Sequence, residues 1–491
     1  MVALGVQGGA VGAGAVGAGA VRARGAGVPR GPSTRVAPSV LAAGIARDRA
    51  VRVAVVRVEG SRARVDVLTR TGPWEVRRVI AAAQADPAVV AVEVDHRVRA
   101  SDVAPAVTAP AAPTSAPAPG GPVPTAASTA TVTATPVADP YRTRQWALTA
   151  LHAEDVRRVA AGAGQVVGVV DSGVDATHPD LAGQVLPGTD EVTPGGDGRA
   201  DAAGHGTHVA GIVAALAGNG IGVEGFAPQA RILPVRALDA AGGGWDSDIA
   251  AGVIWAVDHG AGVVNLSLGG TDSSDAMRSA VLYAVARGTV VVAAVGNERQ
   301  EGNPVEYPAG LSTSVPGVIA VAATTSAGVS AGYSNTGADV TLAAPGDGIL
   351  STYPGGTYAL MSGTSMATPY VSAVAAVIRS AEPGLSPAQV VQVLVASAVD
   401  LEARGRDDAT GAGLVDPSAA LCRLGHCPAA ATPSPSPSPS PSSSTGGPSP
   451  SPSAPAALRV TVAGPAPEAV AGRPATLTVT VSDGAGPVVG A

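Results

Sequence analysis

The sequence predicts an α/β fold, a doubly wound parallel sheet with helices on both faces, preceded by a small α+β module and followed by a Pro/Ser linker and an incomplete β segment. Two observations carry this prediction. In residues 138–428, near-continuous runs of Val, Ile, Leu and Ala alternate with segments of helical periodicity, the pattern of strands buried on both faces of a parallel sheet. Aromatic residues make up only 2% of the 491 residues, so Val, Ala and Leu must fill the core.

Strands and helices are expected to alternate along this central part, because parallel strands need crossover connections. The expected strands are 166–170, 232–235, 263–268, 290–295 and 318–322. The expected helices lie at about 207–217, 247–259, 275–287, 365–380 and 387–396.

A small α+β module is predicted at residues 48–100. Two alternating strands, "VRVAVVRVEG" and "SRARVDVLTR", are joined through Gly60, and a helix begins at Pro73 in "PWEVRRVIAAAQ". "DPAVVAVEVD" adds a further strand. Residues 1–47 begin with an uncharged, Gly-rich stretch, and we expect them to be poorly ordered, with at most a weak signal sequence.

Composition predicts two linkers and a short terminal segment. Residues 101–137 are rich in Pro, Ala and Thr, and residues 429–456 contain a Pro/Ser repeat typical of a stiff tether. Residues 457–491 show strand alternation with turn residues between, but they are too few for a complete β-sandwich.

Charge is distributed unevenly. Residues 1–100 hold 15 Arg against 7 acidic residues, whereas the remainder holds 16 Arg against 31. A basic N-terminal part followed by an acidic remainder favours binding between the two parts over binding to nucleic acid, because the acidic remainder would repel phosphate. After residue 30, no window offers about 18 uninterrupted apolar residues, so we expect no transmembrane segment.

The two cysteines, Cys422 and Cys427, flank His426 in "CRLGHC". Two thiols and one imidazole fall short of a four-ligand metal set. A small disulfide-closed loop is the favoured interpretation if the protein is exported.

A hydroxyl stands at the start of the predicted helix in "SGTSMATPYVSAVAAVI". Because proline is tolerated in the first helical turn, Pro369 is expected to mark that turn. Ser365 then lies where backbone N–H groups lack partners and the helix dipole favours negative charge. An N-cap serine is the simple interpretation, and a nucleophile would need a base and a third, orienting group.

Two further residues could supply those groups. Asp171 follows the strand in "VVGVVDSGVD", and His205 begins a helix in "GHGTHVAG". Taken singly, they could be a turn aspartate and a capping histidine. His205 and His208 could also indicate a metal, but a third ligand at a suitable spacing is missing.

The blocks "VVDSGVDATHPDL", "GHGTHVAG" and "GTSMATP", in this order, resemble the signature blocks of the subtilisin-like serine peptidases, the subtilase or peptidase S8 family. The resemblance implies a subtilisin-like fold and a hydrolase without a catalytic cofactor. It implies that Ser365 is the nucleophile, His205 the general base and Asp171 the group that orients the imidazole. Asn297, in "VVVAAVGNE", matches the family's oxyanion asparagine, with the backbone N–H of Ser365 as second donor; a turn residue is the alternative.

In the family, an extended polypeptide substrate adds a strand between two segments, here Gly242, Gly243 and Gly244 on one side and Ser267, Leu268 and Gly269 on the other. A flexible glycine loop is the alternative for the first segment. Glu306 stands where the family's S1 pocket is floored, and Glu298 follows Asn297. Two carboxylates there would favour a basic P1 side chain, unless the long Glu side chains turn to solvent.

The stretch "LAGNGIGVEG" resembles the family's calcium loop, and hard oxygen ligands in this number suit a structural Ca²⁺. An ordinary Asn-Gly turn is the alternative. The implied ligands are the side chains of Asp180, Asn219 and Gln145 and the carbonyl groups of Leu216, Ile221 and Val223.

Residues 48–100 resemble the inhibitory propeptide of these enzymes, especially in "DPAVVAVEVDHRVRA". The module would plug the cleft until a bond within roughly residues 100–138 is cut. The expectation is therefore a secreted or cell-wall-associated, monomeric serine endopeptidase made as a self-processing zymogen. The alternative is a catalytically silent binding or adhesion protein of the same fold, which loss of any of the four site residues would favour; all four are present.

Overall fold

The structure is a computed structural model that describes residues 28–101, 107–109, 137–428, 459–463 and 478–482. The chain divides into two compact units, residues 1–431 and 432–491. In the second unit, the described residues are two paired antiparallel strands, β17 (Arg459–Ala463) and β18 (Thr478–Ser482). They lie in the segment predicted to be β-rich.

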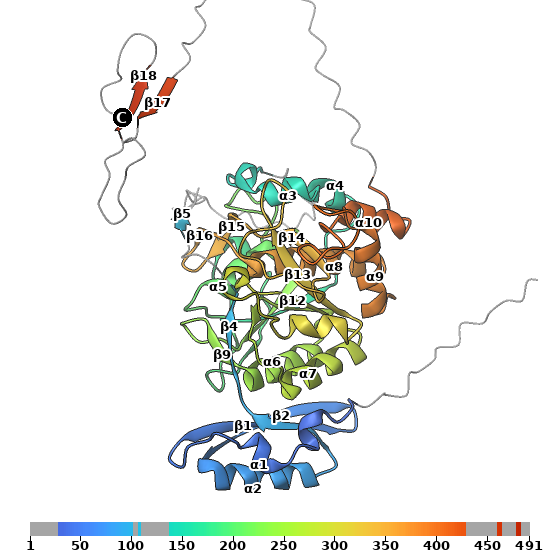
Figure 1. Cartoon of the computed structure of the whole chain (residues 1–491). Coiled ribbons are helices and arrows are strands. Elements are labelled where there is room, and N and C mark those ends of the chain that lie inside the picture. The colour runs from blue at the N-terminus through green and yellow to red at the C-terminus, as the bar shows by residue number, and fades with distance from the viewer. Residues whose placement is uncertain (1–27, 102–106, 110–136, 429–458, 464–477, 483–491) are drawn as a thin grey trace, which may run out of the picture. The chain divides into compact units, whose positions relative to one another are not determined.

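A seven-stranded parallel sheet forms the centre of the first unit (Figure 1). The strand order is β14-β13-β12-β10-β6-β8-β7, and each neighbouring pair is parallel. This sheet confirms the predicted fold class. The strands are β6 (Val166–Asp171), β7 (Thr189–Asp190), β8 (Arg231–Arg236), β10 (Val263–Leu266), β12 (Val290–Ala294), β13 (Val318–Thr324) and β14 (Leu342–Pro345).

Helices cover both faces of this sheet, because successive strand residues point to opposite sides. Val167 and Val169 of β6 belong to the core shared with α5 (His205–Ala214) and α8 (Thr364–Ala381). Val170 belongs to the core on the other face, with α6 (Asp246–Asp258) and α7 (Asp275–Ala286). The remaining α-helices described in this part are α3 (Trp146–Ala150), α4 (Ala153–Arg157), α9 (Pro387–Ser397) and α10 (Pro417–Arg423).

The five predicted strands appear as β6, β8, β10, β12 and β13, and the five predicted helices appear as α5 to α9. Sequence analysis missed the short β7 and β14 and the antiparallel hairpin of β15 (Ile349–Tyr353) and β16 (Thr357–Met361). β14 reads "LAAP", which is too short and too rich in alanine to show a strand pattern.

The module at the front of the chain is a three-stranded antiparallel sheet, in the order β2-β1-β3, covered by α2. Val53 and Val55 of β1 pack with α2, while Ala54 and Val56 share the core of α6 and α7. Both faces of the sheet are therefore buried within one chain, and Figure 1 shows α6 and α7 above the module. The elements are β1 (Ala50–Glu59), β2 (Arg62–Thr71), α2 (Gly72–Ala85) and β3 (Val89–Val94).

Residues ahead of this module were expected to be poorly ordered, and for residues 28–47 the structure differs. It gives them two short helices, η1 (Pro32–Thr34) and α1 (Pro38–Leu41). Ser33 is buried, and its N–H donates to Asp275 Oδ2. These residues add to the module because their polar backbone finds partners on α7 and β3.

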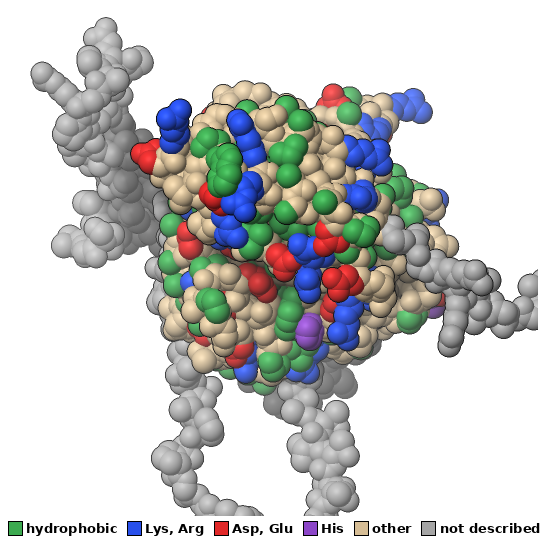
Figure 2. Space-filling view, turned by 90° about the horizontal axis from the view of Figure 1, so that it is seen from below, with side chains coloured by type: hydrophobic (Ala, Val, Ile, Leu, Met, Phe, Trp, Pro, Cys, Tyr) green, Lys and Arg blue, Asp and Glu red, His purple; other side chains and the backbone are tan. Residues whose placement is uncertain are grey.

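The surface of the module is not uniformly basic. On the face seen from below, where α2 lies, Arg side chains are interspersed with acidic and apolar ones (Figure 2). Arg57 is paired with Asp66 and Asp86 inside the module. The net charge of residues 1–100 therefore predicted a more basic surface than the module has.

The predicted linker at 101–137 contains one described strand, β5 (Val107–Ala109), which pairs antiparallel with β16. Residues 1–27 and the linker prediction at 429–456 lie outside the described residues. Cys422 and Cys427 form a disulfide. Among the described helices, none is long and apolar enough to cross a membrane.

Candidate active site

Asp171 and His205 are brought together at one edge of the parallel sheet. Asp171 ends β6 and His205 begins α5, so both lie where the carboxyl ends of the strands meet the helix starts. Asp171 Oδ1 lies 2.7 Å from His205 Nδ1, and Asp171 is fully buried. A carboxylate at Nδ1 holds the proton on that nitrogen, so Nε2 is the atom that can accept another.

Ser365 lies in the first turn of α8, after Gly363 at the N-cap. Its hydroxyl donates to the Ser267 carbonyl at 2.9 Å, and the Ser267 hydroxyl donates to the Ser365 carbonyl at 2.9 Å. The second bond has a local cause. Pro369 lies inside the helix, in its second turn and not in the first as predicted, and it has no N–H to donate to the Ser365 carbonyl. Ser267 therefore takes the place of the missing helical bond.

Asn297 comes after β12, and the oxygen of its side-chain amide is fixed by a hydrogen bond. Its Oδ1 accepts from the backbone N–H of Thr364 at 2.9 Å. Its buried Nδ2 makes no hydrogen bond to any described residue. This geometry presents an N–H donor beside the N-terminus of α8, where the Ser365 N–H also points outward.

A strand of the front part of the chain occupies the cleft. β4 (Arg97–Ala100) pairs antiparallel with β9 (Gly243–Trp245) on one side and with β11 (Leu268–Gly269) on the other. The N–H of Ala100 also donates to the Gly242 carbonyl at 2.9 Å. All six residues predicted to flank an extended peptide thus lie beside one.

Ser101 continues this strand to the serine hydroxyl. Its N–H donates to the Ser267 carbonyl at 3.3 Å, and its own carbonyl accepts from the Ser365 N–H at 3.1 Å. The Ser101 carbonyl therefore lies at the N-terminus of the helix that carries Ser365. Sequence analysis missed Ser101, because nothing in its neighbourhood sets it apart from other linker residues.

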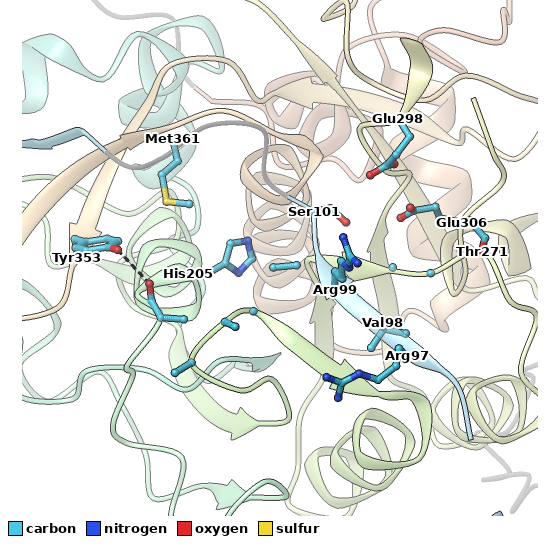
Figure 3. Close-up of a pocket in the computed structure, with 17 residues that line it drawn as sticks. Arg97, Val98, Arg99, Ser101, His205, Thr271, Glu298, Glu306, Tyr353 and Met361 are labelled. Atoms are coloured by element: carbon cyan, nitrogen blue, oxygen red, sulfur yellow. Dashed lines mark hydrogen bonds between the residues drawn. The ribbon is translucent and has the colours of Figure 1, made fainter. Parts of the chain in front are cut away.

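A cavity of about 850 Å³ lies along this strand, lined among others by Ser101, His205, Glu298 and Glu306 (Figure 3). Glu306 is only 7% exposed, so it does not turn to solvent. Burial, and then the charge of Glu298, raise the pKa of Glu306 to about 8. Glu298 accepts from the Asn297 N–H at 2.7 Å and from Asn335 Nδ2 at 3.3 Å.

Most of the predicted calcium ligands gather around Asp180. Its carboxylate accepts from Asn219 Nδ2 at 2.9 Å and from the Val223 N–H at 2.8 Å, and burial raises its pKa to about 7. The carbonyls of Leu216, Ile221 and Val223 accept no hydrogen bond from the described residues. Hard oxygens without donors and a buried carboxylate fit a cation.

Gln145 does not fit the predicted set. Both ends of its amide bind the backbone of Glu224, at 2.8 and 2.9 Å. Asp139, which the predicted set does not contain, also lies at this loop. It accepts from the N–H groups of Gly218 and Gly220, both at 2.7 Å, and its charge raises the pKa of Asp180. An acidic residue so close ahead of Gln145 was the available signal, since a carboxylate is the stronger calcium ligand.

His208 has a structural position. Its Nε2 lies 3.1 Å from the Ile349 carbonyl and 3.0 Å from the Ala359 carbonyl, and burial lowers its pKa to about 3. Among the described residues, no three His, Cys, Asp or Glu side chains gather as a metal site.

Comparison with known proteins agrees with this geometry. The profile of the subtilase family matches residues 162–413. Thermitase from Thermoactinomyces vulgaris is 45% identical over 244 residues, which are 49% of this chain and 85% of thermitase. Subtilisin from Bacillus pumilus is 42% identical over 283 residues, 57% of this chain and 98% of that protein.

Fervidolysin from Fervidobacterium pennivorans is 42% identical over 293 residues, 53% of this chain but only 41% of fervidolysin. Its crystal structure, described as that of a keratinolytic enzyme related to subtilisin, matches with a TM-score of 0.61 at 30% identity. That match covers 76% of this chain and 61% of fervidolysin's. The chain therefore belongs to the subtilase family and is a serine-type endopeptidase.

Proposed function

We propose that this endopeptidase is secreted as a zymogen that cuts its own chain between Ser101 and Asp102. Ser365 is the nucleophile, His205 the general base and Asp171 the group that orients the imidazole. The proposal depends most on one observation: the Ser101 carbonyl accepts from the Ser365 N–H while the residues before it are paired on both sides like a substrate strand.

We expect the reaction to follow from the proposed roles of these groups. Ser365 Oγ attacks the carbonyl carbon, and its proton passes to His205 Nε2, while Asp171 stabilises the imidazolium. The negative charge that forms on the carbonyl oxygen meets the Ser365 N–H and Asn297 Nδ2. The C–N bond breaks as the imidazolium gives its proton to the leaving amine, and water then hydrolyses the acyl-enzyme in the same way.

We propose that the module before residue 101 inhibits the enzyme until it is released. Its last strand occupies both substrate-binding segments, so a second peptide cannot pair with β9 and β11. The buried contact of β1 with α6 and α7 supports a single chain that supplies its own partner, consistent with a monomer.

We also propose one structural calcium ion. Asp180, Asp139 and Asn219 would hold it with the three free carbonyls of the loop, and the Asn219 amide would turn its oxygen inward. The ion would fix the loop that comes after α5 and would have no part in the chemical steps. Secretion is supported by the disulfide, since such bonds persist in oxidising compartments.

Expression of the full chain beside Ser365→Ala tests the proposal. The wild-type chain is expected to yield a new N-terminus at Asp102 and to digest casein, and the variant to stay uncut and inactive. A wild-type chain that folds but leaves casein intact would instead support a silent binding protein. A new N-terminus elsewhere would overturn the assigned cleavage bond alone.

A further inference from the structure

The cavity beside Ser101 is lined by two carboxylates, and neither of them forms an ion pair with another described residue. Ser101, whose carbonyl lies at the Ser365 N–H, lines the same cavity as Glu298 and Glu306. In Figure 3 the two glutamates lie side by side, across Ser101 from His205. A serine side chain is too short to fill a pocket that ends in these carboxylates.

Two glycines leave room for the pair. A Cβ atom on Gly269, in β11, would collide with Glu306 Oε2. A Cβ atom on Gly296 would lie 2.8 Å from Glu298 Oε2 and 2.8 Å from Glu306 Cδ. Because β11 also pairs with the cleft strand, the carboxylates stand in the wall of the pocket that receives the side chain at the position of Ser101.

Two arginines also line the cavity, and one of them is engaged elsewhere. Arg97 lies 3.8 Å from Asp239 and stacks over the Trp245 ring. Among the described residues, neither Glu298 nor Glu306 forms an ion pair, although Arg99 also lines the cavity. A buried carboxylate without a cation is costly, and burial together with the charge of Glu298 raises the pKa of Glu306.

We propose that Glu306 and Glu298 together make the S1 pocket select arginine at P1. A guanidinium has a planar fork of donors that can bind two carboxylates at once, which an ammonium group cannot do as well. The inference rests on the proposed function, because it takes Ser101 as the P1 residue. The chain's own serine would then be a weak P1 residue, and an external substrate with arginine would bind better.

Peptide p-nitroanilides test this directly. Each carries Val-Arg-Ala, the residues 98–100 of the cleft strand, and then Arg, Lys, citrulline or Leu at P1. Citrulline has the shape of arginine without its charge. For the matured enzyme at pH 8.5 we expect kcat/KM for Arg to exceed that for citrulline by about tenfold or more, since charge-assisted hydrogen bonds are the stronger ones. Equal values would overturn the proposal.

Variants of the two glutamates test whether they cause the preference for arginine. Glu306→Gln is expected to bring the Arg-to-citrulline ratio within about twofold of unity, Glu298→Gln to lower it less, and the exposed control Glu301→Gln to keep it. The ratio does not depend on the amount of active enzyme. A ratio that Glu306→Gln leaves unchanged would refute the role of Glu306.

A second measurement needs only the wild-type enzyme. Benzamidine is expected to compete with the leucine peptide, and neutral benzamide is not; equal inhibition by both would contradict a cation-selective pocket. Cleavage of the leucine peptide that Ser365→Ala abolishes would uphold the proposed function even if arginine gives no gain. If no peptide is cleaved by a folded, trimmed enzyme, the proposed function itself fails.

Discussion

The front module touches the catalytic part in two regions that differ in kind. In the cleft, β4 is held by backbone hydrogen bonds to β9 and β11, which any extended peptide could make. At the start of α7, Glu93 accepts from the Ser274 hydroxyl at 2.7 Å and from the N–H groups of Asp275 and Ala276 at 3.0 and 2.7 Å.

A second carboxylate acts in the same way on the neighbouring helix. Asp95 accepts from the N–H of Ser247 at 3.0 Å and from its hydroxyl at 2.6 Å, at the start of α6. Arg52 pairs with Asp95 at 2.8 Å and also with Asp248. Helix N-termini favour negative charge, so these contacts are strong and specific to the module. In the cleft, β4 thus binds as an extended substrate would. At the helix ends, Glu93 and Asp95 add contacts that do not depend on a strand in the cleft.

The largest effect is expected from Ser365→Ala. This variant should not cut itself, so the module should stay covalently joined to the catalytic part with both contact regions intact. Hydrolysis should fall by at least about 10³-fold, because the nucleophile is lost. Casein digestion and N-terminal sequencing measure this. Ser380→Ala, farther along the same helix, is the control, and a variant at Ser365 that still processes itself would refute the assignment.

Asn297→Ala should lower the rate of the chemical step without weakening either contact region between the module and the catalytic part. Losing one oxyanion donor typically lowers kcat by about 10²- to 10³-fold. KM should change little, because β9 and β11 remain. Steady-state kinetics on a peptide substrate decides this, and a loss confined to KM would show that Asn297 binds substrate instead.

Glu93→Gln and Asp95→Asn should weaken only the helix-end region. Hydrogen bonds to a charged group are worth about 1.5–3 kcal/mol, so each variant should shorten the inhibited state after cleavage by roughly tenfold or more. The delay before full activity appears is the measurement. Glu75→Gln, on α2, is the control, and delays equal to wild type would mean that the cleft alone holds the module.

Calcium removal should lower the stability of the catalytic part and should not affect one of the two contact regions more than the other. A site filled at 100 times its Kd stabilises by about 2.7 kcal/mol, which corresponds to a Tm lower by roughly 5–10 °C in chelator. Asp180→Asn should make Tm insensitive to chelator. An unchanged Tm for the wild-type chain would exclude the site.

The smallest effect is that of pH on the helix-end region. Burial, and then the charges of Glu93 and Asp95, raise the pKa of Asp246 to about 8, and His96 Nδ1 lies 4.0 Å from its Oδ2. A raised pKa in the complex means that this contribution is present at low pH and is lost as pH rises through about 8. Release should therefore be roughly three- to tenfold faster at pH 9 than at pH 7. Asp246→Asn should flatten this profile, and faster release at pH 6 would contradict the sign.

Sequence reasoning predicted those features that rest on local patterns. Ordered blocks around Asp171, His205 and Ser365, and strand ends such as Asn297, are readable because a buried strand fixes the position of the residue after it. The position of Ser101 and the partners of Glu93 and Asp95 depend on where β3 leaves the module, which no local pattern encodes. Asp139 was not considered as a calcium ligand for the same reason, since only the fold shows that its side chain lies at the loop of Gly218 and Gly220.

The strand β5 has one further consequence. It begins a few residues beyond the Ser101–Asp102 bond and is itself paired with β16, while β4 is paired upstream. Hydrolysis would therefore nick the chain without separating its parts, because β4 and β5 would stay paired on either side of the cut. Such a molecule would migrate as two bands on a denaturing gel and elute as one peak from a native column.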